Sequence, residues 1–248
     1  MGETDLHRDA MFRHIELLSD YYRGQQVYVS GDLLVYYEQG NPKKFVVPDA
    51  FVVKGILPGR RRIYKIWEEG KVPDVVIETT SRKTKRKDTQ TKPVLYAQLG
   101  IGEYFMFDPE GDYLDPRLQG YRMQGGQYTP IEVDDEGFLF SRELDLRLKI
   151  EQGELQFYRR DTGERLLTAH EQRDQIARAL EAEVAARRAE AAARQVEAAA
   201  RQAEAEARQA EAEGRQAEAA ARQAAEAAAK RAEADVERLR EELRKRQS

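Results

Sequence analysis

The C-terminal third of the chain is one biased repeat, and it limits the possible folds more than any other feature. From about Thr168 a mixed sequence gives way almost entirely to Ala, Glu, Arg and Gln, and arginines recur at seven-residue intervals. Such regularity is typical of a continuous helix. Thr168-Ala169-His170-Glu171 has the pattern of a capping box, which marks a helix start. We therefore divide the chain into a folded domain, residues 1–168, and a long helix or coiled coil, residues 169–248.

Two interpretations of this helix remain open. Glutamates stand four residues before the arginines, as in Glu197 and Arg201, and each such pair stabilises an isolated helix by a few tenths of a kcal/mol. The helix could therefore be a solvated spacer. Alanine also occupies the spacing of coiled-coil a and d positions, for example at Ala203, Ala207 and Ala210, so copies of the chain could associate. Alanine buries little surface, and the association would be weak.

Charge and cysteine content exclude some classes of function. The 248 residues carry a net charge of −4 and no cysteine, which excludes disulfides and Cys-type zinc sites. The overall charge does not indicate a nucleic-acid binder, so local patches must do so. No apolar segment approaches the roughly 18 residues that a membrane span needs. We expect a cytoplasmic protein without membrane contact.

The first 168 residues combine helix and strand patterns, which predicts an α+β fold. A first helix is indicated by apolar residues at helical spacing: Met11, Ile15, Leu18 and Tyr22. A hairpin is expected in QVYVSGDLLVYY, with its turn at Ser30-Gly31-Asp32. KPVLYAQLG predicts a helix that ends at Gly100. RRIYKIW, EYFMFDP and ELDLRLKI predict strands, the last of them among antiparallel strands between about residues 113 and 167.

Two acids interrupt apolar, β-branched runs. Asp49 stands in VVPDAFVV and Glu78 stands in PDVVIETTS, where the neighbouring residues predict buried strands. An ionised carboxylate without a partner costs several kcal/mol in such a place. A hard divalent cation is a natural partner for carboxylate oxygens. The pair therefore predicts a metal site, whereas either acid alone would be read as a solvated strand end. Asp74 is too far along the strand from Glu78 to share one ion, and we expect it at the strand's start.

Positive charge gathers directly after Glu78. The candidate DNA-contacting residues are Arg82, Lys83, Lys85, Arg86 and Lys87. A second cluster is Arg60, Arg61 and Arg62. Such clusters add salt-dependent affinity for phosphates without specifying a base sequence. By themselves they would be read as solvated loops. The three histidines, His7, His14 and His170, are scattered, and we expect them at the surface or at helix caps, away from both acids.

These motifs together resemble a known family. The order VVPDAFVV, RRIYKIWEEGKVPDVVIETTS, a basic stretch with Asp88, then Lys92, Tyr96 and LGIGEYFMFDP is similar to the Uma-two family of restriction endonucleases, over roughly residues 1 to 168. LDPRLQGYRM and DTGERLLT resemble the family as well. The resemblance implies a PD-(D/E)XK nuclease fold, which is a restriction-endonuclease-like mixed β-sheet flanked by helices.

The resemblance also implies roles for individual residues. Asp49 matches the motif aspartate and Glu78 the second acid, and the two would bind Mg²⁺ or Mn²⁺, with the carbonyl of Thr79 as a further ligand. Thr80 stands where the family motif has a lysine. Lys92 is the candidate that would replace this lysine in orienting or deprotonating the attacking water. Pro93 next to Lys92 is comfortable only in the first turn of a helix, so the direction of Lys92 is open. Tyr96 could bond to the site or belong to the core.

Three functions follow from these observations. The first is a divalent-metal-dependent endonuclease that hydrolyses DNA phosphodiester bonds, with Asp49, Glu78 and Lys92 as catalytic residues. The alternative is a catalytically weak or inactive nuclease fold that binds DNA or protein, which the substitution at Thr80 favours. In the third, the helical tail joins copies of the chain, and the folded domain caps the assembly.

Overall fold

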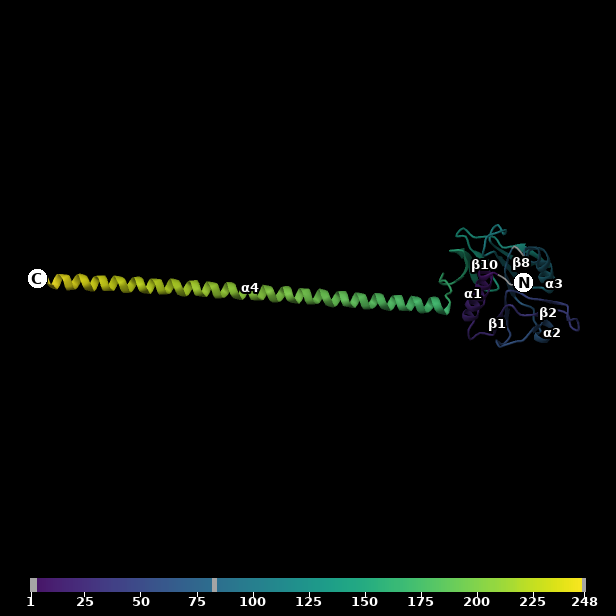
Figure 1. The fold of residues 1–248 in the computed structure, drawn as a ribbon, viewed down its shortest axis with the longest axis horizontal. Coiled ribbons are helices and arrows are strands. Elements are labelled where there is room, and N and C mark those ends of the chain that lie inside the picture. The colour runs from purple at the N-terminus through teal and green to yellow at the C-terminus, as the bar shows by residue number, and fades with distance from the viewer. Residues whose placement is uncertain (1–3, 82–83, 247–248) are drawn as a thin grey trace. The chain divides into compact units, whose positions relative to one another are not determined.

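A computed structural model describes residues 4–81 and 84–246 of the chain. The chain forms two compact units, Met1–Asp174 and Gln175–Ser248, and each is described separately. The first unit contains every strand and the helices α1 to α3 (Figure 1). The α+β class predicted from the sequence is confirmed: mixed sheets lie with helices, and a long helix follows at the C-terminus.

A six-stranded sheet forms the centre of the first unit, in the order β1-β4-β6-β7-β8-β9. Its strands are β1 (Val27–Ser30), β4 (Ala50–Lys54), β6 (Val75–Thr79), β7 (Glu103–Phe107), β8 (Leu118–Gln124) and β9 (Gln127–Pro130). β6 and β7 run parallel, and all other neighbours in this sheet are antiparallel. β4 and β6 contain almost continuous apolar residues because both of their faces are covered.

Alternate residues of these strands belong to two separate cores. On β6, Val75 and Ile77 join a core that includes Leu17 and Leu18 of helix α1 (Asp5–Tyr21). Val76, between them, joins a second core with Tyr96 and other residues of the opposite face. Successive side chains of a strand point to opposite faces, so Glu78 shares the face of Val76. This parity places Glu78 beneath helix α3 (Lys92–Leu99).

A hairpin predicted between residues 26 and 37 is wrong. β1 pairs with β4, whereas β2 (Val35–Tyr36) joins a small sheet between β3 (Phe45–Val46) and β5 (Tyr64–Lys65). The reason is the packing of the expected turn: a Cβ on Gly31 would lie 1.9 Å from the carbonyl oxygen of Asp49. The amide of Asp32 also donates to the carbonyl of Pro48 at 2.9 Å. The segment therefore packs against the chain before β4 and does not turn back on itself.

The strand predicted for RRIYKIW is only partly correct. Tyr64 and Lys65 form β5, but the chain then turns into the short helix α2 (Ile66–Glu69), which ends at Gly70 in a left-handed conformation. The other local predictions are confirmed. α1 covers the predicted first helix, α3 ends at Gly100 with φ 80°, and β7 covers the first five residues of EYFMFDP. A π-helical segment, η1 (Lys87–Thr91), leads directly into α3.

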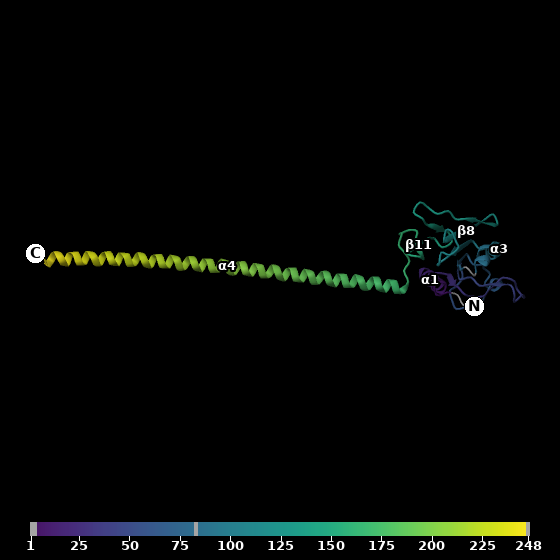
Figure 2. The same cartoon turned by 45° about the horizontal axis from the view of Figure 1, so that its top comes forward.

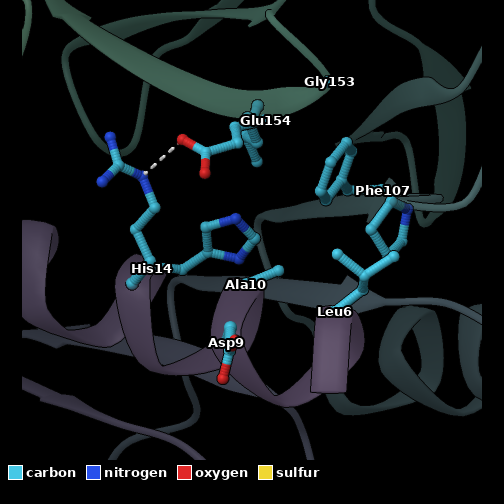
Figure 3. Close-up of a pocket in the computed structure, with 10 residues that line it drawn as sticks. Leu6, Asp9, Ala10, His14, Phe107, Gly153 and Glu154 are labelled. Carbon is cyan, nitrogen blue, oxygen red and sulfur yellow. Dashed lines mark ion pairs between the residues drawn. The ribbon is translucent and has the colours of Figure 1, made fainter. Parts of the chain in front are cut away.

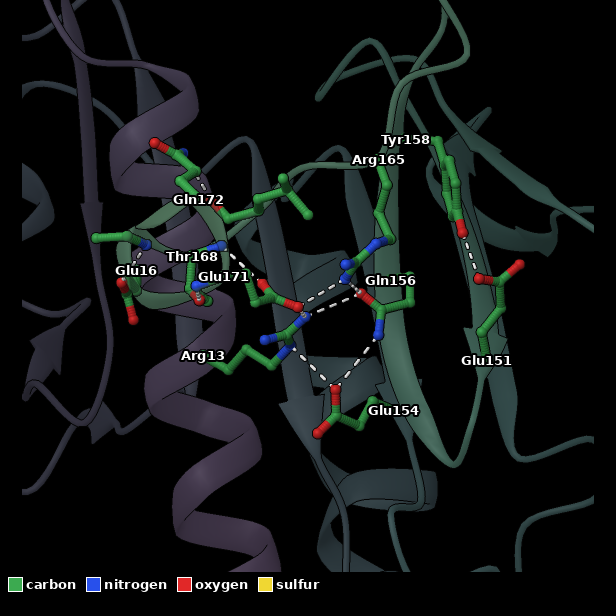
Figure 4. A network of polar contacts seen from close by, with 12 residues as sticks. Arg13, Glu16, Glu151, Glu154, Gln156, Tyr158, Arg165, Thr168, Glu171 and Gln172 are labelled. Atoms are coloured by element: carbon green, nitrogen blue, oxygen red, sulfur yellow. Dashed lines mark hydrogen bonds and ion pairs between the residues drawn. The ribbon is translucent and has the colours of Figure 1, made fainter. Parts of the chain in front are cut away.

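A third sheet, β10-β11-β12, completes the core shared with α1. Its strands are β10 (Leu139–Ser141), β11 (Leu146–Glu151) and β12 (Glu154–Arg159), paired antiparallel as predicted. A polar network ties β12 and α1 to the first turn of α4, all within the first unit (Figure 4). Arg13 lies 3.0 Å from Glu171 and 3.4 Å from Glu154, and Arg165 lies 2.8 Å from Glu171.

Helix α4 (Ala169–Arg246) begins with the predicted capping box. The amide of Thr168 donates to Glu171 at 2.8 Å, and the amide of Glu171 donates back to the Thr168 hydroxyl at 3.3 Å. Farther along, Glu197 and Arg201 pair at 2.6 Å, and the neighbouring repeats form equivalent pairs. These side chains are exposed, so each pair adds only a few tenths of a kcal/mol. Figure 2 draws α4 as one continuous helix. Among the helices of the described residues, none is long and apolar enough to cross a membrane.

Candidate active site

The two acids predicted from the sequence lie side by side where the start of β4 meets the end of β6. β4 and β6 are antiparallel, with Ala50 opposite Ile77, so the next step of this register places Asp49 opposite Glu78. Residues in this relation have Cβ atoms about 4.5–5.5 Å apart. The amide of Thr79 also donates to Oδ2 of Asp49 at 2.8 Å. This bond ties the start of β4 to the end of β6 and fixes one carboxylate oxygen of Asp49.

Glu78 is fully buried, and both of its carboxylate oxygens have partners. The Tyr96 hydroxyl donates to Oε1 at 2.6 Å, and the Lys92 ammonium donates to Oε2 at 2.7 Å. Burial raises the pKa of Glu78, Lys92 counteracts this, and Asp49 adds to it, which leaves the pKa at about 8. Without a metal, Glu78 is therefore mostly protonated at neutral pH.

Lys92 points into the site and pairs with two acids. Its Nζ lies 2.7 Å from Glu78 and 2.9 Å from Oδ1 of Asp88, one helical turn earlier. Pro93 lies in the first turn of α3, where its missing N–H costs nothing. Burial alone would lower the pKa of Lys92, but the neighbouring acidic groups Glu78, Asp88 and Asp49 raise it. Lys92 is therefore a cation in the absence of metal.

Thr80 takes no part in this cluster. Its hydroxyl donates to the carbonyl of Phe107 at 3.4 Å, and its amide donates to the same carbonyl at 2.7 Å. The side chain at the usual position of the motif lysine thus bonds to β7, whereas Lys92 approaches the acids from α3.

Asp88 and Tyr96 belong to the site, although neither was given a definite place from the sequence. Asp88 is buried, which raises its pKa, and the nearby Lys92 opposes this rise. Tyr96 is also fully buried, and burial followed by the nearby Glu78 raises its pKa well above 10. Their spacing to Lys92, four residues on either side, was the available signal, because residues four apart lie on one helix face.

The prediction that His7 and His14 lie at the surface, away from both acids, is wrong. Both are buried, and Nε2 of His7 lies 3.6 Å from Oδ2 of Asp49. The two histidines are seven residues apart on α1, or two turns, so they share the face that Met11 and Leu18 bury. Their match to that apolar stripe was the signal missed. His170 is exposed on α4, as expected.

His14 lines a small cavity on the α1 side of the central sheet (Figure 3). The cavity has a volume of about 80 Å³ and lies beside Phe107 and Glu154. Burial lowers the pKa of His14 to about 3 even though Asp49 acts in the opposite direction, so its ring is neutral at physiological pH.

The basic residues divide into an exposed group after β6 and a second cluster before β5. In the exposed group, Nζ of Lys85 lies 5.0 Å from the ring centroid of Tyr113. Lys85, Arg86 and Lys87 are exposed before and within η1, whereas Arg82 and Lys83 lie outside the described residues. In the second cluster, Arg61 donates to Glu69 at 2.6 and 2.9 Å and covers the ring of Tyr28. Arg61 is therefore committed to the fold. Asp74 directly precedes β6 and accepts the amide of Lys54 at 2.6 Å, at the other end of the strand from Glu78.

The donor set fits a magnesium-type ion that keeps much of its water. Mg²⁺ in proteins is commonly held by one or two carboxylates and several waters. Asp49 and Glu78 supply two adjacent carboxylates, and their repulsion contributes to the raised pKa of Glu78, which a cation would relieve. Within residues 4–81 and 84–246 no group of three or more acidic or histidine side chains is arranged to hold a metal. The protein would thus supply two carboxylate ligands, and water and substrate would supply most of the others.

Comparison with known proteins identifies a family and a related solved structure. Residues 1–156 match the Uma2 family, whose description is "Putative restriction endonuclease". A solved structure from Anabaena variabilis ATCC 29413, titled as a "putative nuclease belonging to DUF820", is similar with a TM-score of 0.43 and 13% sequence identity. The similarity covers 58% of this chain and 76% of that chain. Among curated proteins no match was found.

Proposed function

Because the chain belongs to the Uma2 family, described as "Putative restriction endonuclease", we propose that its first unit is a divalent-metal-dependent endonuclease that hydrolyses DNA phosphodiester bonds. The observation that carries this proposal is the cluster of Asp49, Glu78 and Lys92 at the edge of β4 and β6. Two adjacent carboxylates and a buried ammonium group suit a reaction in which negative charge builds on phosphoryl oxygens.

Asp49 and Glu78, with the carbonyl of Thr79, would hold Mg²⁺ or Mn²⁺. When bound, such an ion stabilises charge on the phosphoryl group and lowers the pKa of a water molecule. The chain's own residues prepare this site: the Thr79 amide orients Asp49, and the Tyr96 hydroxyl orients Glu78. Lys92 is a cation here, so it would orient the attacking water or stabilise developing charge and would not accept a proton.

Exposed cations after β6 would contact the DNA backbone. Lys85, Arg86 and Lys87 are exposed close to Asp88 and Lys92 in the chain. Arg82 and Lys83, outside the described residues, would extend the same segment. Each phosphate contact would strengthen binding in a salt-dependent manner and without base specificity.

Plasmid nicking with and without Mg²⁺ or Mn²⁺ tests this function. We expect metal-dependent nicking that Asp49→Asn and Glu78→Gln each abolish, because each variant keeps the shape of the side chain but removes a ligand charge. Asp135→Asn, at an exposed acid remote in sequence, is the matched control and should cut normally. Equal nicking by the wild type and the Glu78→Gln variant would exclude this site.

The second candidate is a nuclease fold that binds DNA without cutting it. It is favoured by Thr80, which stands at the motif lysine's position and bonds to β7. In that case DNA would be retarded in a gel by the intact chain in every metal condition, and no nicked product would form.

We further propose that the alanine-rich face of α4 joins copies of the chain as a weak coiled coil. This proposal is supported by the seven-residue repeat and by the exposure of every side chain of the helix from Gln175 onward whose burial the structure describes. Sedimentation of the full chain and of a chain truncated after Asp174 tests it. A mass that falls from oligomer to monomer on truncation supports a role in assembly, and an unchanged state leaves α4 as a spacer.

A further inference from the structure

A surface groove lies on the small sheet, in the same unit as the acids. Its volume is about 290 Å³, and it lies between β2, the end of β5 and α2. Sites for small organic ligands usually have roughly 300–1,000 Å³. The groove therefore suits a single ring system better than a large ligand.

Two aromatic side chains line this groove. Tyr36 comes from β2 and Trp67 from α2, and Pro42 and Ile63 add apolar surface. The ring of Tyr36 is held by Phe45 of β3, whose centroid is 5.5 Å away. Trp67 is half-buried. Stacking of a nucleic-acid base on such a side chain contributes about 1–3 kcal/mol.

Positive charge flanks the groove. Lys43 follows Pro42 and Arg62 precedes Ile63, and both are exposed. Within the part of the chain that the structure describes, neither side chain forms an ion pair. The acids at the rim are neutralised: Glu38 lies 3.8 Å from Lys44, and Glu68 lies 2.7 Å from Lys65. The positive charge around the groove therefore favours an anionic ligand, and the aromatic lining favours one that contains a ring.

We propose that this groove binds one unpaired nucleobase of a nucleic-acid strand, with the neighbouring phosphates at Lys43 and Arg62. A base inside a duplex cannot enter, because both of its faces are already stacked, so the ligand is single-stranded or contains an extruded base. The inference rests on the proposed function in so far as the ligand is nucleic acid. It requires neither the metal nor the acids, so the two can be tested apart.

Trp67 is the single tryptophan of the chain and reports directly on this groove. The intact protein in EDTA would be titrated with a short single-stranded oligothymidylate, with a duplex, and with an abasic strand of equal length. We expect saturable quenching of Trp67 fluorescence by the single strand, little by the duplex and none by the abasic strand. Equal quenching by the abasic strand or by the duplex would overturn the proposal.

Variants separate stacking from general charge. Tyr36→Leu keeps an apolar contact to Phe45 but removes one stacking surface, and it should weaken binding roughly 5- to 150-fold, the range for one base–aromatic stack. Lys43→Glu and Arg62→Glu should weaken it and lower its salt dependence. Arg208→Glu in α4 should leave it unchanged. An equal effect of Arg208→Glu would mean nonspecific charge and would overturn the proposal.

The remaining outcomes distinguish this inference from the nuclease proposal. Asp49→Asn should abolish nicking and leave the quenching intact. Nicking without any quenching would overturn the groove proposal alone. Quenching that depends on protein concentration without nucleic acid would show a second copy in the groove and would overturn it as well.

Discussion

Nζ of Lys92 lies 2.7 Å from Oε2 of Glu78, which gives the carboxylate a cationic partner inside the protein. The partner only partly offsets burial, since the pKa of Glu78 stays at about 8. An added divalent cation would therefore have to compete with a proton for Glu78 and would have to share it with Lys92.

Binding of Mg²⁺ should release close to one proton at pH 7. Glu78 is mostly protonated at that pH and must ionise to become a ligand. The apparent affinity should therefore rise about tenfold per pH unit up to pH 8 and then level off. Calorimetry in two buffers of different ionisation enthalpy measures the proton release. A heat that is the same in both buffers, with an affinity that does not change between pH 6 and 8, contradicts the prediction.

The metal-free protein should lose stability as pH rises from about 4.5 to about 8. The pKa of Glu78 is higher in the folded protein than its ordinary value of 4.5. Its contribution to the free energy of unfolding is therefore complete below pH 4.5 and is lost as the pH rises to about 8. Glu78→Gln should flatten this part of the profile, measured by urea unfolding across the pH range. A profile of the same slope in both proteins would show that Glu78 is not responsible.

Two replacements of Lys92 should show how much of its effect on stability and nicking comes from its charge and how much from its geometry. Lys92→Met leaves Glu78 and Asp88 without their cation, so it should lower the melting temperature and reduce nicking by roughly 10²-fold or more. Lys92→Arg keeps the charge and should recover more stability than activity. Lys149→Met, at a partly exposed lysine of β11, is the control. Full activity of Lys92→Met would remove Lys92 from the mechanism.

Gly31→Ala should disturb Asp49 from outside the acid cluster. The added Cβ would lie 1.9 Å from the Asp49 carbonyl and 2.6 Å from Cδ1 of Ile15, and such crowding typically costs about 1–3 kcal/mol or more. We expect a lower melting temperature together with weaker Mg²⁺ binding by calorimetry. Gly59→Ala, where the Cβ meets open space, should change neither. Unchanged metal binding in Gly31→Ala would mean that the Asp49 side chain tolerates the shift.

Glu171→Gln should weaken the junction of α1, β12 and α4 in a pH-dependent manner. Burial opposes ionisation of Glu171, but bonds from Arg13, the Thr168 amide and Arg165 outweigh it and lower the pKa to about 2. The carboxylate therefore stabilises the folded protein above pH 4.5, and this contribution disappears as the pH falls towards 2.

Urea unfolding of both proteins at pH 7 and at pH 3 measures this difference, which should shrink at the lower pH. Glu154→Gln is the control, because Glu154 is more exposed, lies 3.4 Å from Arg13 and should cost less than about 1 kcal/mol. A constant difference at both pH values would contradict the assignment.

Part of the candidate site could be predicted from the sequence because it depends on short-range patterns. Asp49 and Glu78 stand beside or within continuous apolar, β-branched runs that indicate buried strands, so the immediate neighbours of each acid are enough to single it out. Lys92 is only a candidate from the sequence, because the direction of its side chain depends on η1. Nothing in the sequence of η1 predicts this wide helical turn. His7 was misplaced because an imidazole within an apolar stripe was not recognised as buried.

The sequence by itself determined the long helix with its capping box, the inward face of α1, the end of α3 at Gly100 and the presence of one acid directly before a buried strand and another within one. These features depend on contacts within a few residues, where spacing and caps dominate the free energy. Only the tertiary structure decided that β1 pairs with β4, that Asp49 faces Glu78, and that Lys92 and Tyr96 share the carboxylate. Pairings between distant segments depend on how all the side chains of two cores pack together, and no local pattern contains that information.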